Sequence, residues 1–520
     1  MKTMKTTYKI MLLALGFAVF AIQGCEDFET EPQDSIVGID TPDEVAATLF
    51  SAYNSIYNMM GNHGNYNSVQ EVSSDEALIA VKGGDWGDGG IWVRAHNHTF
   101  TPDEGYFEGS WNSCYTAINQ INNGFIDFDG NPGLTPEVKS ELQALRALYY
   151  FFLLDMFGNV PIITEDGNQG QQDRTTVYNF ILDEIAAVQP NLSTGNLIGR
   201  MDYWTMQALK AKMLINQEVY TGTPTNWQAV VVACDDIIDN GPYSLSSSYQ
   251  AIFDQNNGGN SEHIYAIPFD EVFGQGFNLG QMTGHYLTRE TFGSQDQPWN
   301  GYATVTDFYN LYIDSDINPG PQGDVVGLDP QGTIVSGTRD GRLVNFLVGD
   351  QTDMNGNALS DDAAEGDDPN GATLTFTPFI NELEPGSWRQ AGARINKYTL
   401  YNGFLPNLNN DKPIFRLTDI LLMKAEAMHN MTPGNGLSIV NQIRQRAGVD
   451  GFDELNDENL LQERGREMFF EMWRRNDQIR FGTFNDAWQF KGEDPSDHVN
   501  IFPIPRTIVE ASGLQQNPGY

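Results

Sequence analysis

The sequence predicts a mainly α-helical protein with long loops and a few short strands. In two blocks, near residues 42–240 and 411–480, apolar residues recur at three- and four-residue steps, the period of a helix that packs by one face. Between these blocks Gly, Asn, Asp and Pro interrupt short apolar runs, which is typical of strands and ordered loops. With 520 residues, of which 40% are hydrophobic, the chain is long enough to bury a large core.

The first block is expected to contain helices over residues 42–60, 111–125, 136–157, 203–220 and 227–240. The third of these has the clearest boundaries. Pro136 suits the first turn of a helix, and Gly158 and Pro161 end it.

The middle of the chain is expected to hold strands or ordered loops over residues 263–269, 373–379 and 394–400, and an acidic, Gly-rich surface loop over 350–370. The second block predicts three helices, over 417–428, 437–447 and 457–480. The last of them begins with acids and ends with arginines, which suits the helix dipole at both ends. Successive antiparallel helix pairs of this size resemble tetratricopeptide-type packing, although no strict 34-residue repeat is visible.

The N-terminus reads as an export signal. Three lysines precede an apolar run over residues 10–22, which is too short to span a bilayer comfortably and fits a secretory signal. The following Gly24-Cys25 resembles the lipobox of bacterial lipoproteins, in which the Cys is diacylated and becomes the first mature residue. The alternative is a plain signal peptide with an incidental Cys. We therefore expect lipidation at Cys25 and a body that is tethered to a membrane without spanning it.

Charge and cysteine content exclude several classes of function. The chain has 29 Lys and Arg against 69 Asp and Glu, a formal charge of −40, which argues against nucleic acids and anionic surfaces as partners. Cys114 and Cys234 lie in apolar helix-like segments, so buried free thiols are favoured over a disulfide, which stays the alternative. No zinc-binding motif is present.

Five segments resemble motifs of the SusD/RagB family, in the family's order. They are LRALYYFFL with FGNVP (145–161), RLTDILLMKAEA (416–427), NQIRQRAG (441–448), ERGRE with Glu471, Arg474, Asp477 and Arg480 (463–480), and PIP with QNPGY (503–520). The sequence departs from the family pattern at Trp473 and Arg475, which replace small residues and affect packing only.

Many residues in these motifs are charged and resemble active-site residues. Neighbouring Arg and Glu on helices can instead form ion pairs that hold the helices in register. We expect this structural role for Arg146, Arg416, Arg444, Arg446, Glu463 and Arg474.

The resemblance implies a SusD-like fold, in which tetratricopeptide-type helix pairs form a scaffold with long loops. It also implies an outer-membrane lipoprotein on the cell surface of Bacteroidetes, which captures an oligo- or polysaccharide and delivers it to a SusC-like TonB-dependent transporter without catalysis. The acids that follow Cys25 resemble a surface-export signal of such lipoproteins. The expected organisation is a signal peptide (1–24), an N-terminal helical part (25–241), a loop-rich variable glycan-binding part (242–410) and a C-terminal helical part (411–520).

Aromatic residues on loops are the candidate glycan contacts. A flat Trp or Tyr ring can cover the C–H face of a sugar, while Asp, Asn, Gln and Arg hydrogen-bond its hydroxyls. The candidates are Asp85, Trp86, Asp88 and Trp92 in one region, Tyr286, Arg289, Trp299 and Tyr302 in a second, and Trp388 and Arg389 in a third. The alternative is that these rings pin long loops onto the body.

A metal is not expected, and no cofactor is implied. Asp353, Asn355 and Asn357 partly resemble a calcium loop, but the closing Glu is absent, so calcium is a weak possibility.

Three further hypotheses stay open. A glycoside hydrolase would need a carboxylate pair about 5–10 Å apart, and 69 acids make such pairs uninformative. An adhesin or a peptide-binding lipoprotein would share the surface location.

The acidic composition disfavours polyanions and favours a neutral glycan, with a laminarin-type β-glucan as the specific guess.

Overall fold

The computed structural model describes residues 43–83, 85–313, 327–328, 334–336, 340–364, 368 and 371–520. The predicted signal peptide (1–24) and Cys25 lie outside the described residues. The described residues, from 43 onward, belong to one compact unit. No helix within the described ranges is both long and apolar enough to cross a bilayer.

The first block is helical, as predicted. Its helices are α2 (Asp43–Gly61), α3 (Tyr66–Val72), α4 (Ile91–His96), α5 (Gly105–Asp127), α6 (Pro136–Phe157), α7 (Arg174–Val188), α8 (Tyr203–Ile215), α9 (Gln217–Thr221) and α10 (Trp227–Asn240). Its strands are β1 (Ala77–Ile79), β2 (Val160–Thr164) and β3 (Gly167–Gln172). The bounds of α6 and α10 are the predicted ones, whereas the segment 203–220 is divided at Asn216 into α8 and α9.

The middle of the chain mixes short helices and strands. It contains β4 (His263–Ile267), α11 (Leu279–Thr283), α12 (Thr288–Phe292), β5 (Tyr302–Thr304), α13 (Thr306–Ile313), β6 (Gly327–Leu328), β7 (Ile334–Ser336), β8 (Phe346–Leu347), β9 (Gly349–Asp350), β10 (Thr375–Phe376) and β11 (Arg394–Ile395). The second block contains β12 (Lys412–Arg416), α14 (Leu417–Met431), α15 (Leu437–Arg446), α16 (Asp457–Met468), α17 (Arg474–Phe481) and α18 (Arg506–Ser512). Short 3₁₀ helices are η1 (Asp88–Gly90), η2 (Gln189–Asn191), η3 (Gln250–Ile252), η4 (Gly341–Asn345) and η5 (Asp497–Asn500).

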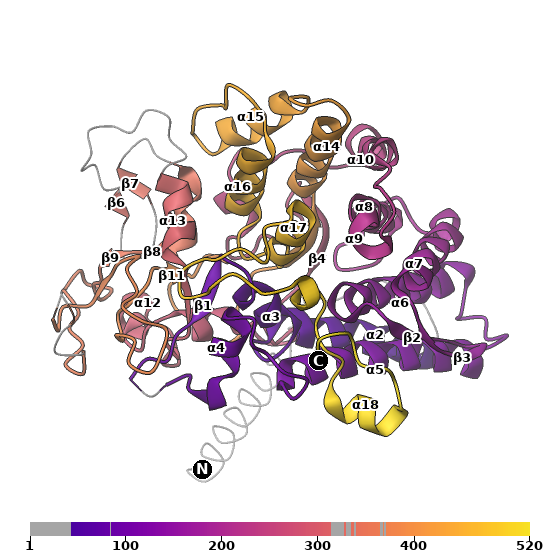
Figure 1. The fold of residues 1–520 in the computed structure, drawn as a ribbon, viewed down its shortest axis with the longest axis horizontal. Helices are drawn as coiled ribbons and strands as arrows, with labels where there is room; N and C mark the ends of the chain where they lie inside the picture. Colours follow the sequence, from indigo (N-terminus) through magenta and orange to yellow (C-terminus); the bar gives the residue numbers. More distant parts are fainter. Residues whose placement is uncertain are drawn as a thin grey trace, which may run out of the picture. The chain divides into compact units, whose positions relative to one another are not determined.

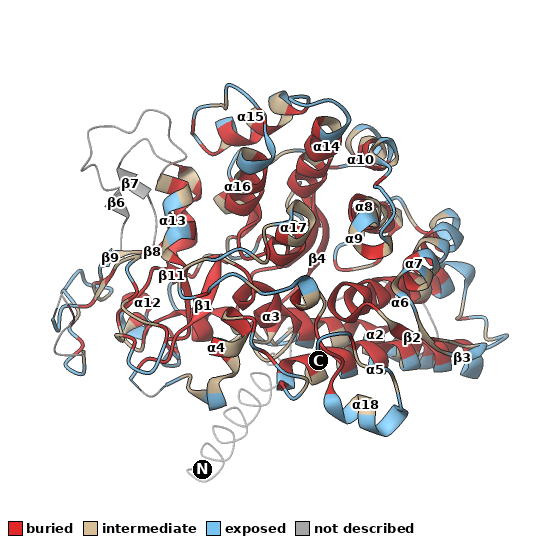
Figure 2. Ribbon diagram, viewed as in Figure 1, coloured by how far each residue is buried: buried red, intermediate tan, exposed pale blue. Residues whose placement is uncertain are grey.

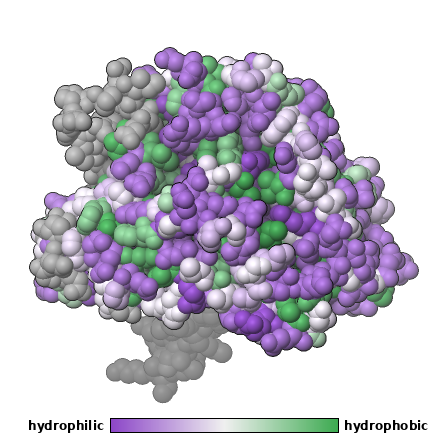
Figure 3. Space-filling model, in the orientation of Figure 1, coloured by the Kyte–Doolittle hydropathy of each residue, from purple (hydrophilic) through white to green (hydrophobic). Residues whose placement is uncertain are grey.

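The helices pack in successive pairs, as the mainly α fold class predicts. Helix α2 contacts α5, α5 contacts α6, α6 contacts α7, and α8 contacts α10 (Figure 1). The contact between α10 and α14 then joins the first block to the second. The helix faces that meet are buried (Figure 2), whereas hydrophilic side chains cover most of the surface visible in Figure 3. Cys114 and Cys234 are buried free thiols, which confirms the favoured interpretation.

The small sheets tie distant segments together. The largest has the strand order β1-β5-β11-β8 and is antiparallel throughout. In its first pair Ala77 lies opposite Thr304, and Ile79 lies opposite Tyr302. Strand β12 pairs with β4, so the loop-rich middle is hydrogen-bonded to both helical blocks.

The single helix predicted over 457–480 is wrong. It breaks into α16 and α17 because Phe470 and Met472 adopt positive φ angles of 57° and 68°, which a right-handed helix does not allow. Their backbone N–H groups donate to buried carboxylates instead, Phe470 to Glu76 (3.3 Å) and Met472 to Glu71 (2.8 Å). The break therefore supplies hydrogen-bond donors to two acids that have no exposed surface.

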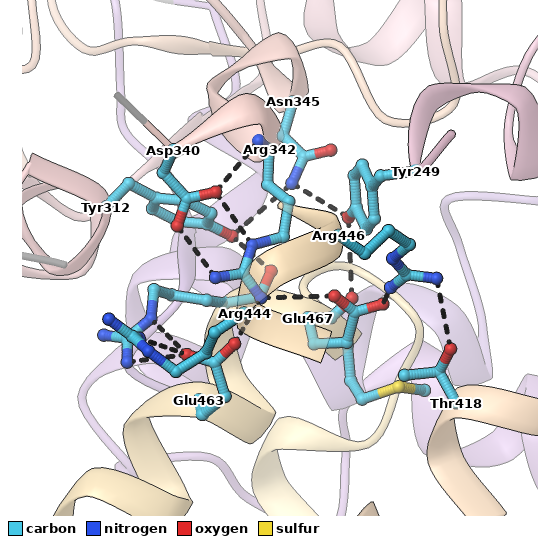
Figure 4. A network of polar contacts seen from close by, with 12 residues as sticks. Tyr249, Tyr312, Asp340, Arg342, Asn345, Thr418, Arg444, Arg446, Glu463 and Glu467 are labelled. Carbon is cyan, nitrogen blue, oxygen red and sulfur yellow. Dashed lines mark hydrogen bonds and ion pairs between the residues drawn. The ribbon is translucent and has the colours of Figure 1, made fainter. Parts of the chain in front are cut away.

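The charged motif residues form a buried ion-pair network (Figure 4). Glu463 pairs with Arg342 (2.7 Å) and Arg444 (2.9 Å). Glu467 pairs with Arg416 (2.9 Å), with Arg342 (3.2 Å) and closely with Arg446. Burial alone would raise the pKa of Glu463, but Arg342, Arg466 and Arg444 hold it near 2. Both carboxylates therefore stay ionised and join the end of α15, helix α16 and the segment before β8.

The two remaining residues of the predicted structural set are also ion-paired. Arg146 on α6 binds Glu184 on α7 (2.7 Å) and Glu165 (2.5 Å), and Arg474 on α17 binds Asp75 (2.6 Å). The structural interpretation of all six charged residues is thus confirmed.

Removing one charge from this network should be costly. We expect Glu467→Gln, which preserves shape, to lower the free energy of unfolding by about 3–5 kcal/mol, because it leaves three buried guanidinium groups short of a counter-charge. Urea unfolding measures this. As a control, Asp103→Asn removes an exposed partner of Arg506 and should leave stability almost unchanged. Equal effects from the two variants would contradict a stabilising network.

Candidate functional site

The pairing of β1 with β5 brings two aromatic segments to one place. Because these strands are antiparallel and Ile79 lies opposite Tyr302, the chain leaving β1 and the chain entering β5 are at the same end of the sheet. The first carries Trp86 and the second carries Trp299. More than 200 residues separate the two indoles in sequence, yet one strand pair sets their neighbourhood.

The turn that presents Trp86 closes on itself. The backbone N–H of Lys82 donates to the carbonyl of Asp85 (3.1 Å), and the N–H of Asp85 donates back to Lys82 (2.9 Å). Trp86 follows with a φ angle of 62°, and its half-buried ring packs against the core. Its indole N–H donates to the carbonyl oxygen of Trp299 (2.6 Å), so the two segments are directly joined.

The segment that presents Trp299 is held by its backbone. The N–H groups of Trp299, Asn300 and Gly301 donate to carbonyls at and just after α11, at distances of 2.6, 2.8 and 2.7 Å. Gly301 must stay small, because a Cβ there would lie 2.6 Å from the carbonyl oxygen of Met282 and 3.0 Å from the Trp86 ring. The Trp299 ring itself is 40% exposed, so a fixed backbone presents an accessible indole.

These elements enclose a cavity of about 370 Å³. Its lining residues are His63, Asp85, Trp86, Asp88, Tyr286, Gln297, Pro298 and Trp299. The His63 ring lies between the indoles, with centroid distances of 6.1 Å to Trp86 and 5.4 Å to Trp299, and is edge-on to both. The cavity thus combines flat apolar rings with carboxylate, amide and imidazole groups.

His63 is a neutral hydrogen-bond donor in this cavity. Its Nδ1 accepts from the Asn278 side-chain amide (3.0 Å), which places the ring proton on Nε2. Burial lowers the pKa of His63 below its ordinary value, against the opposing effect of Asp88. The ring proton on Nε2 makes His63 a hydrogen-bond donor.

A half-buried guanidinium contacts the Tyr286 ring. The guanidinium of Arg389 lies 4.6 Å from the Tyr286 ring centroid and pairs with Asp361 (3.0 Å). Asp361 also accepts from Nε2 of His285 (3.0 Å), whose Nδ1 accepts from the backbone of Leu287 (3.1 Å). Asp361 is buried, so the acidic segment 350–370 is not entirely the surface loop that was expected, and part of it braces the cavity.

The cavity unites five of the predicted site residues and leaves out others. Asp85, Trp86, Asp88, Tyr286 and Trp299 line it. Arg389 stands behind Tyr286, Arg289 is exposed and pairs with Glu290 (3.1 Å), and Trp388 packs on Phe379 with ring centroids 5.7 Å apart.

Two predicted ring contacts are wrong, because the rings lie in the core. Trp92 is 3% exposed; it packs against Tyr106 and donates to Asp88 (3.1 Å). Tyr302 is 1% exposed, because it begins the inner strand β5, and its hydroxyl bonds to Ser68. Sequence reasoning missed His63, which lies in the short connection between α2 and α3, far in sequence from both Trp86 and Trp299.

The weak calcium pattern is a self-contained turn. The Asp353 carboxylate accepts from the backbones of Asn355 (2.8 Å) and Asn357 (2.9 Å) and from the Asn357 side chain (2.9 Å). These contacts account for the spacing of the three residues. Across the described ranges, no group of three or more His, Cys, Asp or Glu is arranged to hold a metal.

Comparison with known proteins connects this geometry to a family. Residues 261–520 match the family model described as the SusD family, and residues 30–188 match one described as starch-binding, associating with outer membrane. A SusD-like protein of Formosa agariphila is 23% identical, covering 98% of this chain and 97% of its own. The starch-binding protein SusD of Bacteroides thetaiotaomicron is 25% identical over 74% of this chain and 72% of its own. A solved laminarin-binding SusD-like protein has the same fold, with a TM-score of 0.68 at 21% identity over 92% of this chain and 100% of that one.

The two indoles should differ in their effect on stability. Trp86 packs on the core and donates a hydrogen bond, so we expect Trp86→Ala to lower the free energy of unfolding by about 1–3 kcal/mol. Trp299→Ala removes a more exposed ring and should cost less than about 1 kcal/mol. Urea unfolding of both variants decides this, and the reverse order would contradict the described roles.

The bracing histidine should make stability depend on pH. Burial lowers the pKa of His285 to about 4, against about 6.5 in the unfolded chain, so the unfolded state binds more protons between these values. Its contribution to stability is complete above pH 6.5 and is lost as the pH falls toward 4. His285→Asn keeps an acceptor for the backbone of Leu287 and removes this titration.

We expect the free energy of unfolding of the wild type to fall by about 1–2 kcal/mol relative to His285→Asn between pH 7.5 and pH 5. Denaturant titrations at each pH supply the two curves. Parallel curves for the two proteins would contradict this, because they would mean that the pKa of His285 is the same in the folded and unfolded states.

Proposed function

Because the chain belongs to the SusD family, we propose that it captures an oligo- or polysaccharide at the cell surface and delivers it to a SusC-like TonB-dependent transporter. The capture site is the cavity between Trp86 and Trp299. One observation carries this proposal: a partly exposed indole, a second indole and a neutral His surround one cavity on a backbone held by hydrogen bonds.

The cavity suits the two surfaces of a sugar. The face of a pyranose ring is made of C–H bonds, which an indole covers, whereas its edge carries hydroxyl groups. Asp85, Asp88 and Gln297 offer acceptors for these hydroxyls, and His63 offers a donor. Because the segments are already fixed, little ordering entropy opposes binding.

Charge favours a neutral glycan. Among the described residues that line the cavity none is Lys or Arg, and two are carboxylates. A uronate or sulfate group would meet like charge there, in a chain whose formal charge is −40. A neutral glucan or mannan fits better. A laminarin-type β-glucan is the first ligand to test, because a solved relative with the same fold is named as laminarin-binding.

The location follows from sequence and family. We place the protein on the outer membrane, facing outward and anchored by lipid on Cys25. The family model described as associating with outer membrane supports this location. Cys25 itself rests on the lipobox resemblance alone.

We propose binding without bond cleavage. The two curated relatives are named as a SusD-like protein and a starch-binding protein. Release of reducing ends from laminarin by the purified protein would contradict this part of the proposal. Retention of soluble oligosaccharide separates nutrient capture from an adhesin that binds only protein.

Removing the exposed indole should weaken glycan binding directly. In native gels containing laminarin, we expect Trp299→Ala to raise the dissociation constant about tenfold, or about 1.4 kcal/mol. Phe50→Ala removes a 47% exposed ring on α2, away from the cavity, and should migrate like the wild type. If laminarin, pustulan and mannan all leave the migration of the wild type unchanged, the protein does not capture these neutral glycans and the proposal fails. If alginate retains the protein more strongly than they do, the inferred preference for a neutral glycan is wrong.

A further inference from the structure

A buried lysine connects the two aromatic segments. Lys82 is 1% exposed and lies at the start of the turn that presents Trp86. Its backbone closes that turn through both hydrogen bonds with Asp85. Its side chain extends the other way, and Nζ donates to the carbonyls of Asn300 (3.2 Å) and Gly301 (2.9 Å). One residue thus holds the Trp86 turn by its main chain and the Trp299 segment by its side chain.

Three successive carbonyls complete this connection. The carbonyl of Trp299 accepts from the Trp86 indole (2.6 Å), and the next two accept from Lys82. The backbone N–H groups of Trp299, Asn300 and Gly301 donate to other carbonyls, in and just after α11. The segment that carries Trp299 is therefore clamped on both sides, and Lys82 supplies two of the six hydrogen bonds.

Burying the Lys82 ammonium is costly. No carboxylate of the described chain pairs with its ammonium, and the nearest charge that acts on it is the buried Arg394. Desolvation lowers the pKa of Lys82 well below its ordinary value, which reflects the cost of burying this charge. A Met of similar length would fill the space without that cost, but it would remove the donor to the carbonyls of Asn300 and Gly301.

We propose that Lys82 is a positioning residue of the candidate site: it sets the separation and angle of the Trp86 and Trp299 rings, and so the affinity for the bound glycan. Lys82 touches no ligand in this role, because it lies beneath the cavity and not in its lining. The effect on affinity rests on the proposed function, whereas the effect on the rings does not.

The first test needs no ligand. The protein is labelled with 5-fluorotryptophan, and the resonances of Trp86 and Trp299, among nine Trp residues, are assigned from the Trp86→Phe and Trp299→Phe variants. We expect Lys82→Met to shift or broaden both resonances and to leave those of the core residues Trp111 and Trp204 in place. Unchanged Trp86 and Trp299 resonances would overturn the positioning role, even if the protein binds no glycan.

The second test is a double-mutant cycle for laminarin binding. We expect Lys82→Met to weaken binding about five- to tenfold in the wild type and less than twofold in the Trp299→Ala background, because the lysine acts through that ring. Equal losses in both backgrounds would show that Lys82 acts elsewhere and would overturn the proposal. Absence of binding by the wild type would instead remove the proposed function and leave the spectroscopic test standing.

A matched control separates positioning from the general loss of a buried lysine. Lys491 is also buried, and its Nζ donates to two backbone carbonyls, of Asp486 (3.0 Å) and Gly492 (3.1 Å), outside the cavity. Unlike Lys82, it also pairs with a carboxylate, that of Asp494 (2.9 Å). Lys491→Met should keep laminarin affinity within twofold and leave the two indole resonances unmoved. If Lys82→Met does not fold cooperatively, Lys82→Gln, which keeps a shorter donor, takes its place with the same expectations. An effect of Lys491→Met on affinity equal to that of Lys82→Met would overturn the proposal.

Discussion

The antiparallel pairing of β1 with β5 is the constraint on which the candidate site depends. It joins residue 79 to residue 302 and so places two turns at one end of a small sheet. The two turns are joined to each other. The Trp86 indole N–H donates to the Trp299 carbonyl, and the Lys82 side chain donates to the carbonyls of Asn300 and Gly301. Strands of only three residues are sufficient, since helices and ion pairs fix the segments on either side.

The scaffold and the site use charge in opposite ways. In the scaffold, carboxylates and guanidinium groups are buried together, so that Glu463 and Glu467 each face several arginines and remain ionised. At the site, Asp85 and Asp88 are exposed at a cavity whose described lining contains no cation. The charged residues of the motifs lie in the scaffold and not in the cavity lining, whereas Trp86 and Trp299, which lie among polar residues and glycines, line the cavity. The two uses of charge follow from the cost of removing an ion from water. A buried ion needs a partner of opposite charge, whereas an exposed ion stays hydrated and does not.

Sequence reasoning predicted what is local. The helix over 136–157 follows from apolar spacing and a proline at its start, and the structure has the same bounds. The break at Phe470 and Met472 could not be predicted, since bulky residues rarely adopt positive φ and the buried acids that accept from them lie 394 and 401 residues away. Trp86 and Trp299 were identified from their polar, glycine-rich surroundings. Trp92 and Tyr302 have similar neighbours but opposite burial, and His63 joins the cavity only through tertiary packing.

The attachment of the two rings to neighbouring strands has a mechanical consequence. A long polymer held between them would pull on both turns at once, at the same end of the β1–β5 pair. A pull that drew the two turns apart would open this strand pair from that end, one hydrogen bond after another. The Trp86 indole and Lys82 bond across the two segments at that end, so tension from a long bound polymer would fall on these contacts before it reached the sheet.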